Sequence, residues 1–167
     1  TNRPYHHGDL RHALIETAMG MLREDKGWQF TLREVARRAG VSHAAPYKHF
    51  PDKAALLVEL ALLGFDELRQ TLMAAKTRRP KSLRDEFVAM AHAYVRFGTS
   101  NPALYRLMFS ADAGKAGDVH LNERALSAFG VLVELLERGQ TGGILRKRDV
   151  RGQAAAGAVA AAACTAS

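Results

Sequence analysis

Apolar residues recur at three- and four-residue spacing along almost the whole chain, and no useful stretch alternates with the period of a strand. One stripe from Leu10 to Leu22 predicts a first helix over residues 9–25. A longer stripe from Leu56 to Leu72 predicts a helix over residues 52–77. Further helices are expected over residues 82–98, 103–109, 119–138 and 150–167. The pattern therefore predicts an all-α protein.

Residues 31–50, TLREVARRAGVSHAAPYKHF, differ from the long helices because they predict two short ones joined by a tight turn. Thr31 is a good N-cap, and Glu34 three residues later completes a capping box. Gly40 stands where the chain must turn sharply, a position that favours a residue tolerant of positive φ. Ser42 can cap the helix that follows. This spacing predicts a helix-turn-helix.

The second short helix, expected over residues 43–50, carries the chemistry that a DNA-reading helix needs. Such a helix has small residues at its tip and phosphate-reaching groups on its flanks. His43, Ala44 and Ala45 are the expected tip, and Tyr47, Lys48 and His49 are the expected flanks. Among these, we expect His43, Ala44 and Lys48 to face base edges, and Tyr47 and His49 to hold the DNA backbone. Two short helices around an Ala-Gly turn also occur in helical proteins that bind no nucleic acid, so the aromatic and basic ending is what favours DNA.

Composition adds little to this picture. The chain has 167 residues, 47% of them hydrophobic and 25% charged, which is ordinary for a globular protein. Its formal net charge is +7, but the first 53 residues hold only nine Lys and Arg against six Asp and Glu. The basic charge is thus spread along the chain, and basicity alone would be a weak argument for a polyanionic partner.

Several function classes are unsupported by the sequence. A single cysteine, Cys164, permits no intrachain disulfide or cysteine-based zinc site, and fits a reducing, cytoplasmic setting. We find no Gly-rich phosphate loop, metal-ligand cluster or catalytic triad, so we expect no enzyme, no metal and no cofactor. No run of strongly apolar residues is long enough to cross a bilayer, so we expect no membrane partner.

Two stretches, HHGDLRHALIETAMGML and GWQFTLREVARRAGVSHAAPYKHFPDKAALLVEL, resemble the N-terminal half of TetR-family transcriptional repressors. The capping Thr, the AGVS turn, the Y-x-HF ending and the following acid-Lys pair all stand in register. The stretch AYVRFGTSNPALYRLMF resembles the TetR subgroup whose C-terminal domain carries a Trp-His-Gly signature. That signature itself is absent, since AAAGAVAAAACTAS occupies the region where it is expected.

The resemblance implies a DNA-binding domain over residues 1–53 and a helical regulatory and dimerisation domain over residues 54–167. Each subunit would hold a three-helix head, joined by a long helix to a larger body. Residues 42–50 would enter the major groove, with Thr31 and Lys53 on phosphates. Our DNA-binding set is Thr31, Arg33, Ser42, His43, Ala44, Tyr47, Lys48, His49 and Lys53.

One departure from the family pattern lies inside the expected recognition helix. Many relatives carry Leu or a β-branched residue where this chain has Pro46. Proline is tolerated in the first turn of a helix, so we expect it to stiffen the helix rather than break it.

By resemblance, the protein is a homodimeric repressor that a small-molecule effector releases from a pseudo-palindromic operator. Only one of the two dimer helices is expected here, so either the second lies beyond Ser167 or the dimer is built differently. Possible pocket lining is Met90, Tyr94, Phe97, Tyr105, Met108 and Phe109, with His92 and Arg96 as polar handles. The same spacing suits an ordinary helical core. The alternative function is a basic helical module that binds nucleic acid without sequence choice.

Overall fold

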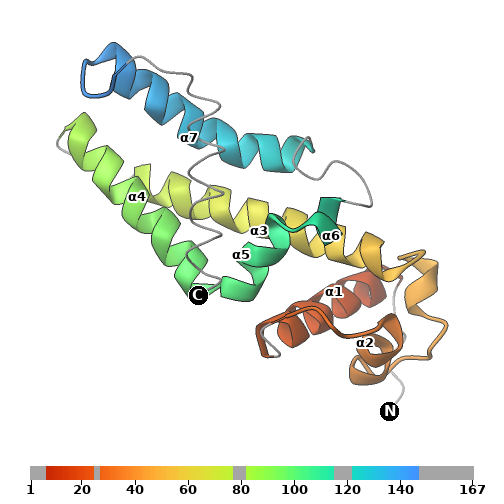
Figure 1. Cartoon of the computed structure of the whole chain (residues 1–167). Coiled ribbons are helices and arrows are strands. Elements are labelled where there is room, and N and C mark those ends of the chain that lie inside the picture. The colour runs from red at the N-terminus through yellow and green to blue at the C-terminus, as the bar shows by residue number, and fades with distance from the viewer. Residues whose placement is uncertain (1–6, 25–26, 77–81, 115–121, 147–167) are drawn as a thin grey trace.

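The computed structural model describes residues 7–24, 27–76, 82–114 and 122–146, and these ranges contain helices but no strand (Figure 1). The elements are α1 (His7–Glu24), α2 (Leu32–Arg38), the 3₁₀ helix η1 (Pro46–Lys48), α3 (Lys53–Lys76), α4 (Leu83–Ser100), α5 (Pro102–Met108), α6 (Ala111–Gly114) and α7 (Glu123–Thr141). The all-α prediction is confirmed.

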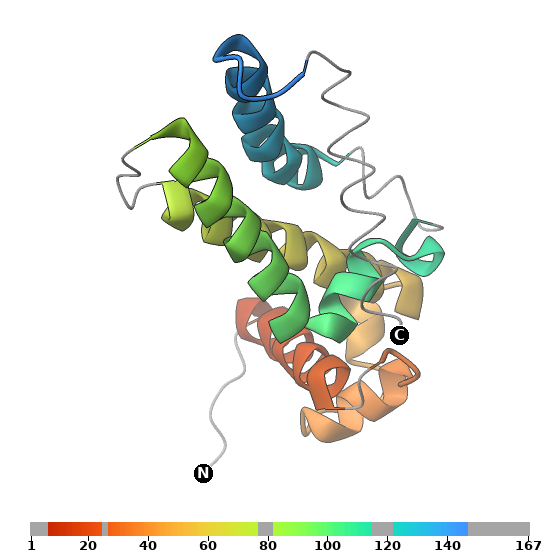
Figure 2. The ribbon, with the colours of Figure 1, turned by 60° about the vertical axis from the view of Figure 1, so that its left-hand side comes forward.

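Helix α3 is the axis of the molecule. It contacts α1 in the head and α4, α5, α6 and α7 in the body. In Figure 1, α1 and α2 lie at one end of α3, while α4 and α7 pack along the rest of it. Figure 2 shows the same separation of a small N-terminal head from a larger helical body after a turn of the molecule.

The length of α3 follows from its cap and from its apolar face. Asp52 precedes its first residue, and the Asp52 Oδ1 accepts a hydrogen bond from the Ala55 backbone N–H at 2.8 Å. Buried leucines continue from Leu56 to Leu72. With 24 residues at 1.5 Å each, the helix is about 36 Å long. The predicted long connecting helix is thus confirmed.

A glycine lets α5 cross closely over α3. A Cβ placed on Gly64 would lie 2.7 Å from the Met108 Sδ and 3.1 Å from the Leu104 Cδ1. Met108 and Leu104 are both fully buried. The absence of a side chain at this position therefore sets the spacing between the two helices.

The helix boundaries differ little from those predicted, with two exceptions in the body. Ser82 caps α4 by accepting a hydrogen bond from the Asp85 N–H. Asn122 caps α7 by accepting from the Arg124 N–H, so α7 begins at Glu123 rather than at residue 119. The sequence predicted no helix at residues 111–114, where α6 forms one turn. The predicted helix over residues 150–167 lies outside the described residues.

Candidate nucleic-acid interface

Helix α2 is fixed at its start by the predicted capping box. The Glu34 N–H donates to the Thr31 Oγ1 at 3.2 Å, and the Thr31 N–H donates to the Glu34 Oε2 at 2.6 Å. Hydrogen bonds from the backbone N–H and the hydroxyl of Thr31 lower the pKa of Glu34 below its usual value of 4.5. Because the Thr31 hydroxyl also donates to Glu34, at 2.9 Å, a phosphate would compete with this carboxylate for it.

The buried and exposed faces of α2 separate as the sequence predicts. Leu32, Val35 and Ala36 are buried, while Arg33 and Arg37 are exposed. The apolar face is in the core of the head, so the basic face is open to a partner.

The turn after α2 also has the predicted geometry. Gly40 has a φ of +70°, the left-handed conformation that glycine adopts without steric cost. Its N–H donates to the Arg37 carbonyl, and the Val41 N–H returns to the Ala36 carbonyl at 3.0 Å. Val41 packs partly against the core of the head. The chain therefore turns tightly at Gly40 and continues into residues 42–50.

The predicted helix over residues 43–50 is wrong in extent, because only η1 over Pro46–Lys48 is regular. Pro46 has no N–H, so it cannot donate to the Ser42 carbonyl as the fifth residue of an α-turn would. The Ala45 N–H donates to that carbonyl instead, at 3.0 Å. Pro46 therefore does not merely stiffen an α-helix; it begins a tighter 3₁₀ turn, closed by the His49 N–H on the Pro46 carbonyl at 2.9 Å.

This short segment, residues 42–50, is called the recognition segment below. Its exposed side chains are those of Ser42, His43, Ala44, Tyr47 and Lys48, and its buried ones are those of Ala45, Pro46 and Phe50. Tyr47 is 50% exposed. The surface thus presents small residues followed by an aromatic and a basic side chain, as expected for a DNA-reading tip. The expectation that Ala45 belongs to this tip is wrong, because its side chain faces the core.

Two residues that were predicted to contact phosphates, His49 and Lys53, are less exposed than the rest of this surface. His49 is half-buried, and its Nε2 is buried without a hydrogen-bond partner in the part of the chain that the structure describes. Lys53, the first residue of α3, is half-buried, with its Nζ 5.6 Å from the centre of the Phe30 ring. Lys53 therefore lies next to the recognition segment in a cation-π contact that restrains its ammonium group.

The six residues predicted as pocket lining belong to the hydrophobic core of the body, and none of them lines the groove between α3 and α4. Met90, Phe97, Tyr105 and Met108 are buried, and Tyr94 and Phe109 are partly buried. The Tyr94 and Tyr105 hydroxyls are 2.7 Å apart, and the Tyr105 ring lies 4.9 Å from that of Phe109. Burial, followed by the hydrogen bond with Tyr105, raises the pKa of Tyr94; burial also raises the pKa of Tyr105.

A groove of about 490 Å³ runs between α3 and α4. Its lining is Thr71, Ala74, Ala75, Ala89, His92, Ala93 and Arg96. The floor is made of small side chains, and the two residues predicted as polar handles stand at its edge. This volume is within the range of small-molecule sites.

Sequence reasoning missed the residues that connect the head to the body. Trp28, in the loop after α1, donates from its Nε1 to the Asp112 Oδ2 of α6 at 2.9 Å. Arg124 of α7 contacts Glu59 and Asp66 of α3. These partners are separated by 58 to 84 residues in sequence, so no local pattern signals them.

The described residues show neither a metal-binding cluster nor a membrane-spanning helix. Residues 7–24, 27–76, 82–114 and 122–146 contain no group of three His, Cys, Asp or Glu placed to hold a metal ion. No helix in the described part of the chain has both the length and the hydrophobicity needed to span a membrane.

The fold and the exposed recognition segment define a helix-turn-helix DNA-binding protein with a helical C-terminal body. Comparison with known sequences agrees. The family described as "Bacterial regulatory proteins, tetR family" matches residues 14–60, and "Tetracyclin repressor-like, C-terminal domain" matches residues 87–166. Nucleoid occlusion factor SlmA of Alteromonas mediterranea is 27% identical over 144 residues, covering 84% of this chain and 69% of SlmA.

Solved structures show the same fold. A protein of unknown function from Rhodococcus sp. RHA1 is 37% identical, with a TM-score of 0.78, covering 95% of this chain and 81% of that one. The TetR-family transcriptional regulator PfmR from Thermus thermophilus is 21% identical, with a TM-score of 0.63, covering 86% of this chain and 79% of PfmR. The chain belongs to the TetR family of transcriptional regulators, proteins that dimerise, bind DNA and respond to ligands. The predicted resemblance is confirmed at this level, and the Trp-His-Gly subgroup stays a prediction.

Proposed function

We propose that this protein is a repressor whose homodimer binds a pseudo-palindromic operator and is released by a small-molecule effector. The observation that carries the proposal is the recognition segment, in which the side chains from Ser42 to Ala44, with Tyr47 and Lys48, are exposed while Pro46 and Phe50 anchor the backbone in the core. A rigid, exposed tip of this kind fits a groove of DNA.

Within this tip, the roles follow from side-chain chemistry. His43, Ala44 and Lys48 face base edges: the Ala44 methyl suits a thymine methyl, and the Lys48 ammonium suits the guanine acceptors. Ser42 and Tyr47 bind the DNA backbone. His49 and Lys53 are placed on phosphates as well, and both need a side-chain rearrangement to reach them fully.

Helix α2 supplies the remaining contacts. Arg33 is exposed on its basic face and reaches a phosphate beside the groove. Thr31 fixes the start of α2 through the capping box, so its contribution to DNA binding comes at least partly through the orientation of that helix.

The functional division is residues 1–53 for DNA binding and 54–167 for regulation and dimerisation. Helix α3 crosses this boundary without interruption, because it begins at Lys53 and ends at Lys76. A movement of the body along α3 is thereby transmitted to the head as a rigid displacement.

The outward face of α7 supports dimerisation through the body. Leu126 is 50% exposed, Gly130 is exposed and Val133 is only partly buried, at spacings that place them on one stripe. A second copy that covers this stripe would remove apolar surface from water. In such a dimer the two recognition segments would stand about 34–36 Å apart, one turn of duplex.

The effector site is proposed at the groove between α3 and α4. Arg96 and His92 at its edge suit a ligand with an anionic or hydrogen-bonding group, and the alanine floor suits a small apolar body. The core residues Met90, Tyr94, Phe97, Tyr105, Met108 and Phe109 do not line this groove. They would join the site only if a ligand opened the core at Tyr94 or Phe109, the two members that are only partly buried.

In vitro selection from random duplexes at physiological salt tests the proposal. A repressor of this kind selects a pseudo-palindrome with half-sites one helical turn apart. A basic module without sequence choice recovers no motif, and its affinity varies only with salt. Repression is then measured with the selected site placed between a promoter and a reporter gene.

A further inference from the structure

Arg11, on α1, touches both the recognition segment and the long helix α3. Its guanidinium carbon lies 5.5 Å from the centre of the Phe50 ring, and its Nη2 lies 3.0 Å from the Glu59 Oε2. Phe50 is the buried last residue of the recognition segment, and its N–H closes the turn that carries Tyr47 and Lys48. Arg11 therefore holds the end of this segment against a fixed point on α3.

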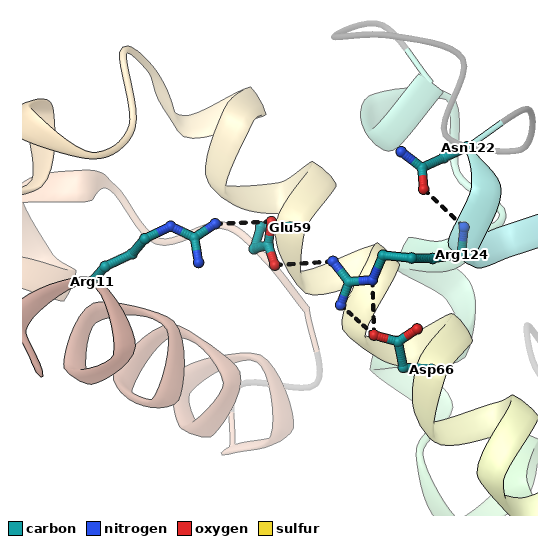
Figure 3. A network of polar contacts seen from close by, with 5 residues as sticks. All are labelled: Arg11, Glu59, Asp66, Asn122 and Arg124. Carbon is teal, nitrogen blue, oxygen red and sulfur yellow. Dashed lines mark hydrogen bonds and ion pairs between the residues drawn. The ribbon is translucent and has the colours of Figure 1, made fainter. Parts of the chain in front are cut away.

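That fixed point is shared with the body. The other carboxylate oxygen of Glu59, Oε1, accepts a hydrogen bond from the Arg124 Nη1 at 3.1 Å (Figure 3). Arg124 also binds the Asp66 Oδ2 through its Nε at 2.8 Å and through its Nη2. Asp66 and Glu59 are seven residues apart on α3, so both lie on the same face of that helix.

Arg124 is held firmly at the start of α7. Its backbone N–H donates to the Asn122 Oδ1 at 3.0 Å, the hydrogen bond that caps this helix. Hydrogen bonds to Asp66 and Glu59 raise the pKa of its guanidinium, with Asp66 the larger contributor, so it stays charged. The position of Arg124 on α3 is therefore fixed together with the position of the N-terminal end of α7.

We propose that Arg124, Glu59, Arg11 and Phe50, called the arginine relay below, set the position of the recognition segment according to the position of α7. Arg124 holds the Glu59 carboxylate in the orientation that Arg11 needs, and Arg11 in turn holds Phe50. When the end of α7 moves away, Glu59 loses one of its two donors and becomes free to rotate. Arg11 then loses its fixed partner, and the recognition segment loses its preferred arrangement.

Burial favours this coupling over an ordinary surface ion pair. The Glu59 side chain is only 20% exposed, that of Arg124 32% and that of Arg11 45%, so it is mainly the burial of the shared Glu59 that reduces the screening of these attractions by solvent. Arg23 and Glu67 form a second pair between α1 and α3, at 3.4 Å, with exposures of 51% and 42%. Among the described residues, neither side chain of that pair forms an ion pair with α7, so the pair provides a matched control.

The inference rests on the proposed DNA-binding function, so the test has one readout with DNA and one without. With the selected duplex, we expect Arg124→Gln to weaken binding about threefold and Arg11→Gln at least as much. The double variant should bind no more weakly than Arg11→Gln alone, because both act through Glu59. The control Arg23→Gln, which removes the same charge from α1, should change affinity less than either.

The second readout is the ring resonances of Phe50 in the free protein, measured by NMR. We expect Arg124→Gln to shift them, and the shift to vanish when the same substitution is made in a Glu59→Gln background. Thermal unfolding of each variant shows that it is folded.

Three results overturn the relay: additive losses of affinity, an equal loss from Arg23→Gln, or Phe50 resonances unmoved by Arg124→Gln. If the wild-type protein selects no duplex, the proposed function fails instead, and the Phe50 resonances still decide the relay.

Discussion

Arg138 of α7 and Glu86 of α4 form an ion pair with two parallel hydrogen bonds, Nη1 to Oε1 at 2.7 Å and Nη2 to Oε2 at 2.9 Å. Glu86 is 5% exposed, and it is the buried charged residue among those that the structure describes. The hydrogen bonds to Glu86 and its charge raise the pKa of Arg138. This pair ties α7 to α4, at the end of α7 away from Arg124.

We expect Arg138→Ala to lower the melting temperature by about 5 °C or more, because it leaves the buried Glu86 carboxylate without its partner. Replacing both residues, as Glu86→Leu with Arg138→Met, should recover most of the loss, since no buried charge then remains. Calorimetry on the two variants measures the difference. The control is Arg84→Ala, which changes an exposed residue of the same helix α4. A double variant that is less stable than Arg138→Ala would contradict this explanation.

Gly64→Ala should destabilise the protein by about 1–3 kcal/mol, because the new Cβ would lie 2.7 Å from the Met108 Sδ in a full core. Gly20→Ala is the matched control: it lies inside α1, and nothing stands within 4 Å of the added methyl. The control should stabilise by roughly 0.5–1 kcal/mol through helix propensity alone. Urea unfolding of both variants tests the prediction, which fails if the two changes have the same sign.

The capping box gives a defined pH dependence. The pKa of Glu34 is lowered in the folded state, so the unfolded chain binds more protons than the folded protein near pH 4.5. The stabilisation that the Glu34 carboxylate gives the folded state is therefore lost as the pH falls below that value. Glu34→Gln should therefore be less stable than the wild-type protein at neutral pH by an amount that is constant above about pH 6 and shrinks below pH 4.5. Chemical unfolding across about pH 3–7 measures it; a difference that grows toward acid pH would contradict the cap.

Lys53→Ala should weaken binding to all duplexes alike and reduce the slope of log K against log salt by about 0.9, the value for one phosphate contact. The reason is its place at the start of α3, directly after the recognition segment. Arg96→Ala removes an exposed charge from the body instead and should leave the slope unchanged. If both variants give the same slope as the wild-type protein, Lys53 does not contact a phosphate.

Local features of the fold were predictable from sequence because their causes are local. The capping box needs only Thr31 and Glu34 at the right spacing, and the turn needs only a glycine at position 40. The stripe that becomes α3 is likewise visible as a repeat. The location of the recognition segment can be predicted from the sequence, but its conformation cannot. The sequence shows that Pro46 lacks an N–H, whereas only the structure shows that the Ser42 carbonyl accepts from the Ala45 N–H instead.

Long-range polar contacts could not be predicted in this way. Glu59 and Arg124 lie 65 residues apart, and neither stands in a motif. The pocket prediction shows the same limit: the spacing from Met90 to Phe109 predicts buried residues, which they are for the most part, but it does not distinguish a ligand site from a core. That distinction depends on where neighbouring helices leave space, and the groove between α3 and α4 is lined by other residues, among them His92 and Arg96.

The exposed recognition segment is proposed to read base edges, and a change at Lys48 tests this role most directly. Selection from random duplexes is run in parallel with the wild-type protein and with Lys48→Ala. We predict that the variant selects the same pseudo-palindrome with relaxed preference at one base pair in each half-site, a loss of about 1–3 kcal/mol of discrimination there. An unchanged preference at every position, with or without weaker binding, would contradict base reading by this segment at Lys48.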